Sequence, residues 1–415
     1  MPHSLKQIAF FIFLPVLIFA QVQEEVEAPP HIKSIVFNGP TGDQFPIVQI
    51  GEKIDLEFDD LTASEQDYYY KIIHCDYDWT PSDLLKSQYL RGVDNQRIID
   101  YENSYTTLQP FSNYRLSIPN ENVSLKVSGN YVLEIYNSNY ELQFSRRFVI
   151  YKDLVKVGTE IKRSRDFNFL NDKQVVQFRI FGGNTELVNP KKEVKVAIIQ
   201  NHYWPTAIFN VAPQFTLGTE LVYKYDLETS FFGGNEFFNF DTKDLRAPSA
   251  AISRIDLTDL YNHYLYSNNY RGGQPYTYFP DINGDYVVRT LQGDDDSREA
   301  EYTNVHFSLP YDEVLNLDDV YVFGKFNNYA LTEENKMQYD EADGMMKASI
   351  SLKQGFYNYK YVIKNDLNIV DLNTICGNFH FTENNYTVLV YYRNFGDLYD
   401  SVIGVGTANS RNISN

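Results

Sequence analysis

Histidines and carboxylates are the residue types that could carry acid–base or metal chemistry in this chain. The sequence has 7 His and 55 Asp and Glu among 415 residues. Catalysis and metal binding need such groups at fixed spacing, as in the H-E-x-x-H pair of zinc proteases. No H-E-x-x-H or H-x-H pair occurs, and no G-x-S-x-G nucleophile turn is present. We therefore expect no catalytic residue, no cofactor and no enzyme activity.

One short motif has the first ligands of a calcium loop. The segment D-I-N-G-D occupies residues 281–285. A complete loop needs a bidentate Glu at its twelfth position, and Gln292 stands there. Asn-Gly beside Asp is also a common hairpin turn. The motif predicts a turn, with no metal site.

The two cysteines, Cys75 and Cys376, lie in distant parts of the chain. Neither has a C-x-x-C partner, which argues against structural zinc and thioredoxin chemistry. We expect two buried, unpaired side chains. A disulfide stays open as the alternative if the chain is exported.

Aromatic side chains offer a different chemistry, that of protein contacts. The chain has 34 Tyr and 29 Phe but only 2 Trp. Tyr and Trp combine apolar area with a hydrogen-bonding tip and are enriched at interface hot spots. Two segments stand out, a knot at 202–204 beside a proline and a Tyr-rich stretch at 260–278; in both, covering a sheet edge is the alternative role. The predicted partner-binding residues are His202, Tyr203, Trp204, Tyr264, Tyr266 and Tyr270.

Charge and the N-terminal segment constrain location and partners. A net charge of -19 disfavours nucleic acid and anionic membrane surfaces. Lys6 followed by an apolar run to residue 20 is typical of a signal peptide and is too short to span a bilayer. We predict a signal peptide over 1–20, a flexible acidic arm over 21–28, and a mature protein without direct membrane insertion.

The elements that position these residues are short Tyr- and Phe-rich runs separated by turns. Such runs favour strands, so we predict an all-β fold of tandem immunoglobulin-like β-sandwich domains. Residues 29–151 form the first domain, with Trp79 packed at a sheet rim or in the core. The other expected units are a middle β-rich domain at 152–300, a C-terminal sandwich at 301–396, and a tail at 397–415 that frays past Gly406.

The C-terminal sandwich carries a first family resemblance. V-Y-V-F-G-K-F-N-N-Y at 320–329 and G-F-Y-N-Y-K-Y-V at 355–362 resemble glycogen- and starch-binding (early-set) modules. Those modules place a Trp where this chain has Tyr329. The resemblance implies the fold of 301–396 and leaves a periplasmic carbohydrate-binding protein as the alternative function.

Seven segments together resemble the type IX secretion system plug proteins of Bacteroidota. They are residues 70–81, 100–119, 129–136, 232–241, 320–328, 355–362 and 382–393. The resemblance implies a non-enzymatic periplasmic subunit, peripherally associated with the outer-membrane translocon barrel. Such a subunit would bind the periplasmic side of the barrel and close its channel when no substrate complex is engaged. The oligomeric state stays open.

Overall fold

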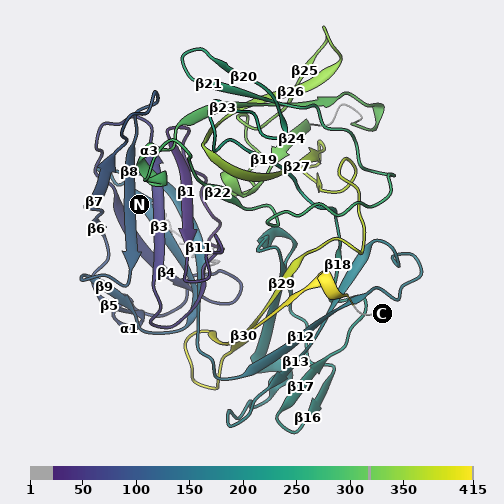
Figure 1. Cartoon of the computed structure of the whole chain (residues 1–415). Coiled ribbons are helices and arrows are strands. Elements are labelled where there is room, and N and C mark those ends of the chain that lie inside the picture. Colours follow the sequence, from purple (N-terminus) through teal and green to yellow (C-terminus); the bar gives the residue numbers. More distant parts are fainter. Residues whose placement is uncertain (1–21, 316–318, 414–415) are drawn as a thin grey trace, which may run out of the picture.

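The structure, a computed structural model, describes residues 22–315 and 319–413, so the predicted signal peptide lies outside it. Strands make up 44% of the chain and helix 6%, which confirms the all-β prediction. Seven sheets pack into three units (Figure 1). The helices in the described ranges are single turns, and none has the length and apolarity that a bilayer crossing requires.

The N-terminal unit is a two-sheet sandwich drawn in purple and blue in Figure 1. Its two main sheets have the orders β1-β3-β8-β7 and β2-β11-β10-β4-β6, and β5 and β9 form a separate two-stranded sheet. Apolar residues at period two on both inner faces, including Phe58, Ile72 and Tyr131, are fully buried between them. The elements are β1 (Ile32–Asn38), β2 (Ile47–Gln49), β3 (Ile54–Asp60), β4 (Tyr69–Cys75), α1 (Lys86–Tyr89), β5 (Leu90–Gly92), β6 (Gln96–Arg97), β7 (Asp100–Asn103), β8 (Ser112–Ile118), β9 (Val123–Leu125), β10 (Gly129–Tyr136) and β11 (Leu142–Tyr151).

The second unit combines strands from the middle and the end of the chain. Sheet β12-β13-β17-β16, with β18 attached to β13, shares a core with sheet β15-β14-β29-β30. The elements are β12 (Lys156–Arg163), β13 (Lys173–Phe181), α2 (Pro190–Glu193), β14 (Val194–Gln200), η1 (Trp204–Thr206), β15 (Ile208–Phe209), β16 (Phe215–Leu217), β17 (Glu220–Tyr223), β18 (Ser230–Phe232), β29 (Asn385–Tyr392), β30 (Ser401–Asn409) and η4 (Ser410–Asn412).

The third unit lies at the top of Figure 1. Sheet β19-β27-β22, with β24 and β28 also on β27, shares a core with sheet β20-β21-β23-β26-β25. The elements are β19 (Phe238–Asp241), β20 (Ile252–Leu257), β21 (Tyr261–Leu265), β22 (Tyr286–Val288), α3 (Asp296–Glu299), β23 (Tyr302–Pro310), η2 (Glu313–Leu315), β24 (Asp319–Phe323), η3 (Lys325–Asn327), β25 (Gln338–Asp340), β26 (Met345–Lys353), β27 (Gly355–Lys364) and β28 (Val370–Asp371).

The expected division at residue 300 does not follow these sheets. Strand β14 pairs with β29, and both β19 and β22 pair with β27, so strands from 152–300 and 301–396 share sheets. The expected frayed tail also needs correction, because β30 pairs with β29 as far as Asn409. Val402 and Ile403 of that strand are buried, and this burial holds the segment in place.

The expected flexible arm is instead docked where the structure describes it, from residue 22 onward. The Val26 N–H donates to Ser145 Oγ at 2.8 Å, and the Ser145 N–H donates to the Val26 carbonyl at 3.0 Å. The Arg147 N–H donates to Glu25 Oε1 at 2.6 Å. The reason is that β2 pairs only with the last residues of β11. The edge of β11 before Val149 is therefore left open, and the arm covers it.

Both cysteines are free and buried, as the sequence predicted. Cys376 packs in the core of the third unit, whereas Cys75 belongs to the cluster that joins the first and second units. Burial raises the pKa of the Cys75 thiol to about 12, so it stays a neutral, apolar side chain at physiological pH.

Candidate functional site

The predicted knot at 202–204 lies at the junction of the first two units. Asn201 and His202 have positive φ values of 48° and 55°, which turn the chain sharply after β14. This turn directs Trp204 into the junction, where its ring meets Trp79 edge-on with centroids 4.8 Å apart. Phe45 packs on Trp204 at 5.5 Å. The two Trp of the chain therefore form one contact between units.

Burial limits what this knot can offer to a partner. Trp204 is only 9% exposed, and Trp79, at 3%, is in the core as the sequence predicted. His202 stacks on Phe45 at 6.0 Å, and burial lowers the pKa of its imidazole. The sequence shows that residues 202–204 are aromatic. It does not show that they pack inside the protein, because that depends on the fold bringing Phe45 and Trp79 next to them.

Tyr203 turns the other way, toward the third unit. Its ring packs edge-on against Tyr329 at 5.1 Å and against Phe323 at 5.6 Å. Tyr329 in turn packs on Phe323 at 4.8 Å. A sugar-stacking platform needs an open ring face, and these contacts cover the ring of Tyr329, which stands at the position of the Trp in starch-binding modules. This arrangement argues against the carbohydrate alternative.

The predicted tyrosines of 260–278 lie elsewhere, on and just after β21 in the outer sheet. Tyr264 stacks on His306 with centroids 4.2 Å apart and 8° between planes. The Arg254 guanidinium lies over the Tyr264 ring, 3.9 Å from its centroid. Tyr266 is 61% exposed, whereas Tyr270 packs against the core of the third unit. We call Arg254, Tyr264, Tyr266 and His306 the outer-sheet patch.

The structure thus separates the six predicted residues into three places. Residues 202–204 fill junctions between units, Tyr264 and Tyr266 belong to the outer-sheet patch, and Tyr270 packs against the core of the third unit. Strand β21 lies at the top of Figure 1. Strand β14, which leads into the knot, pairs with β29, and β29 lies in the lower half of the figure. The sequence could not reveal this separation, because spacing along the chain does not report distance in the folded structure.

A buried ion pair between the first and third units was not predicted. Lys353 Nζ of β26 contacts Asp59 Oδ2 of β3 at 2.7 Å, with side chains 1% and 0% exposed. Tyr302 Oη also donates to Asp59 Oδ2 at 2.7 Å, and Asn113 Nδ2 donates to Oδ1 at 2.8 Å. Lys353 further donates to the Ser297 carbonyl at 2.6 Å. No local pattern marks one Asp in an acidic strand as the partner of a distant Lys.

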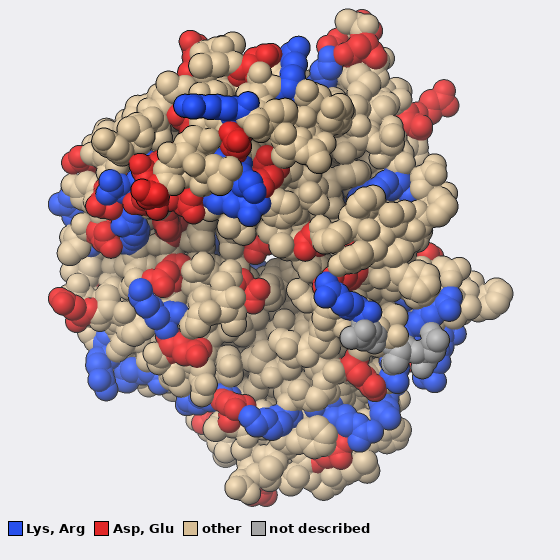
Figure 2. Space-filling view, in the orientation of Figure 1, with Lys and Arg blue, Asp and Glu red and all other residues tan. Residues whose placement is uncertain are grey.

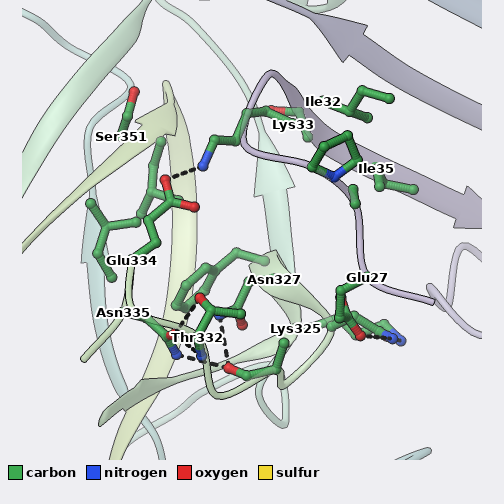
Figure 3. Close-up of a pocket in the computed structure, with 18 of the residues that line it drawn as sticks. Glu27, Ile32, Lys33, Ile35, Lys325, Asn327, Thr332, Glu334, Asn335 and Ser351 are labelled. Carbon is green, nitrogen blue, oxygen red and sulfur yellow. Dashed lines mark hydrogen bonds and ion pairs between the residues drawn. The ribbon is translucent and has the colours of Figure 1, made fainter. Parts of the chain in front are cut away.

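A second contact between these units surrounds the small pocket in Figure 3. Lys33 of β1 forms an ion pair with Glu334 of the loop after η3. Asn335 holds that loop by donating to the Val322 carbonyl at 2.7 Å and the Ala330 carbonyl at 2.8 Å. The pocket has a volume of about 80 Å³, which suits a few waters and is too small for an organic ligand.

Charged side chains lie on the surface and in the turn at 281–285. Acidic and basic side chains are interleaved on the face in Figure 2, around a hollow where the units meet. Asp281 Oδ1 accepts the Asn283 N–H at 2.8 Å, so this carboxylate closes the predicted turn. Within 22–315 and 319–413, no group of three or more His, Cys, Asp and Glu is arranged to hold a metal ion.

Comparisons with known proteins point to one family. The family model of the type 9 secretion system plug protein first domain matches residues 32–152. The whole chain is similar to the crystal structure of a hypothetical protein from Parabacteroides merdae ATCC 43184. The two share 30% sequence identity and a TM-score of 0.87, over 93% of this chain and 98% of that one. No functionally curated protein matches the sequence.

Proposed function

This chain belongs to the type IX secretion system plug protein family, and from that premise we propose that it closes the secretion channel. It is a non-enzymatic periplasmic subunit that binds the periplasmic side of the outer-membrane translocon barrel. It blocks the channel while no substrate complex is engaged. The observation that carries this proposal is the family match over residues 32–152.

The joints between units support the proposal, because a plug must keep its shape against a wide opening. The Trp79–Trp204 contact joins the first and second units, and the buried Asp59–Lys353 pair joins the first and third. The docked arm adds contacts between Glu25 and Asn328 Nδ2, at 2.9 Å. A body fixed in this way loses little conformational freedom on binding.

The outer-sheet patch is the contact surface we propose. Tyr266 is 61% exposed and is available without rearrangement, whereas Tyr264 is half-buried and is held in place by Arg254 and His306. Tyr and Arg are the residue types that dominate interface hot spots. His202 and Tyr203 stay secondary candidates, since most of their ring contacts are internal.

The test is ion conductance through the purified translocon with and without the mature chain. We expect the chain to reduce the leak and to form a complex in size-exclusion chromatography. Association should slow as salt rises, because a chain of net charge -19 is steered electrostatically. An unchanged leak together with no complex would reject the plug function.

Matched variants test the contact surface separately. Tyr266→Ala should weaken binding about tenfold or more, the cost of losing an interface anchor. Tyr105→Ala is the control, because Tyr105 is also 61% exposed but lies on the N-terminal sandwich. If the complex forms and both variants bind like the parent chain, the plug function stands and the proposed contact surface is wrong.

A further inference from the structure

A cleft of about 690 Å³ lies between the second and third units. Strands β15, β18 and β28 line it, and each pairs with a single neighbour in the described chain. Strands at a sheet edge leave backbone groups unpaired and accept an added extended segment. The volume falls in the range of roughly 300–1,000 Å³ that is typical of ligand pockets. The cleft therefore has the size and the walls for a short extended chain.

Lys360 of β27 places an unpaired cation in this cleft. The residue is 9% exposed, and its Nζ lies 4.0 Å over the Phe237 ring. Among residues 22–315 and 319–413, no acceptor lies within hydrogen-bond distance of Nζ and no carboxylate oxygen within 4.0 Å. An ammonium has three N–H donors, and because the Lys360 Nζ is not fully enclosed, these donors face the cleft and are open to solvent or to a ligand. An anionic ligand would supply the missing acceptors.

The neighbouring carboxylates are occupied by other donors. Glu236 Oε1 accepts from Tyr276 Oη at 2.5 Å and from the Glu383 N–H at 3.1 Å. Asp371 is the acidic residue in the described lining of the cleft. Its Oδ1 accepts the backbone N–H groups of Asn373 and Thr374 at 2.8 and 2.9 Å. Both acids thus already accept hydrogen bonds from other groups of the chain, so Lys360 is left for a partner from outside.

Other donors face the same space. Lys173 lines the cleft with its Nζ 4.7 Å over the Phe232 ring, and it has no ion pair within the described chain. Asn378 Oδ1 accepts the Gly234 N–H at 2.7 Å, which leaves its amide N–H groups as donors. A Cβ at Gly234 would lie 3.4 Å from Lys360 Nζ, so the Gly234 backbone lies directly beside the ammonium. Two lysines against one acid make the cleft cationic in an acidic chain.

The apolar lining selects the class of anion. Phe232 is 46% exposed at the cleft, and Ile208 and Leu372 line it as well. An inorganic anion would leave this apolar surface unused. An acidic sugar would need an open ring face, but Tyr203 and Tyr329 pack on each other. A peptide has both a carboxylate and apolar side chains, and its backbone can pair with edge strands.

We propose that this cleft binds an extended peptide segment of a partner protein, whose Asp or Glu side chain pairs with Lys360 and whose apolar side chains contact Phe232. The inference stands apart from channel closure. The experiment uses the purified chain without the translocon. A failure of peptide binding therefore leaves the channel-closure proposal unaffected, and the reverse also holds.

The experiment selects a phage-displayed library of random heptapeptides on the immobilised mature chain. We expect the enriched peptides to share one acidic position flanked by apolar residues. A synthetic enriched peptide is then compared with its analogue in which the acid is replaced by the amide, by fluorescence anisotropy. The amide analogue and the Lys360→Met variant should each weaken binding at least tenfold. Combined, they should cost little more than either alone, because both remove the same pair.

Lys191→Met is the matched control, because it removes the same charge from an exposed lysine outside the cleft. It should change affinity less than twofold. If Lys360→Met melts below the parent chain, Phe232→Ala replaces it, and the side-chain NMR signal of Lys360 should shift when the peptide binds. Lack of enrichment, enriched peptides without an acidic position, or binding that survives the loss of Lys360 would overturn the proposal. Tighter binding of glucuronate than of the peptide would overturn it in favour of an acidic sugar.

Discussion

Removing Lys353 should strongly destabilise the joint between the first and third units. In Lys353→Met, Asp59 keeps its donors from Tyr302 and Asn113 but loses its only contacting cation in the described chain. Breaking a fully buried ion pair on one side costs about 3–5 kcal/mol, because a charge is left uncompensated in the interior. That loss corresponds to roughly 150-fold or more in the folding equilibrium constant.

Urea denaturation followed by tryptophan fluorescence measures this loss, since both tryptophans lie at a junction between units. The midpoint should fall in Lys353→Met and in Asp59→Asn. The double variant should recover more than half of the loss of Lys353→Met, because it removes both charges and leaves none unpaired. Lys347→Met is the control: it lies on the same strand, but its ion pairs with Asp340 and Asp343 are exposed, so the midpoint should stay unchanged.

A change in the free energy of unfolding of less than about 1 kcal/mol in Lys353→Met, the range of a surface ion pair, would contradict this expectation. Losses of the two single variants that add in the double variant would contradict it as well. Additivity would mean that the two side chains act independently and that their contact does not couple the units.

Three further outcomes follow from the same structure. Trp204→Ala should lower the free energy of unfolding by about 3–5 kcal/mol, the cost of deleting a buried aromatic, whereas the exposed Tyr266→Ala should leave the urea midpoint unchanged. Acid should destabilise the fold, because burial lowers the pKa of His74 and of His263 to about 4. Between about pH 6.5 and 4 the unfolded chain then binds more protons, so the thermal midpoint falls as the pH falls, and less so in His263→Phe; an equal fall in that variant would contradict this assignment. Calorimetry with glycogen should detect no binding, because the ring of Tyr329 is covered; millimolar binding that is lost in a folded Tyr329→Ala would restore the carbohydrate function.

The sequence by itself determined the local features of this protein. Runs of Tyr, Phe and β-branched residues at period two predicted strands, and the strand content confirms this. The motif segments predicted the family. Each of these depends on residues close together in the chain, so no knowledge of the fold was needed.

Only the tertiary structure decided how distant segments meet. It pairs β14 with β29, incorporates the tail as β30 and docks the N-terminal arm on β11. It turns Trp204 inward onto Trp79 and leaves Lys360 without an acceptor at a cleft. Strand propensity says that a segment will pair but not with which partner, because many strands have similar apolar patterns. The choice depends on register, edge availability and shape across the whole chain.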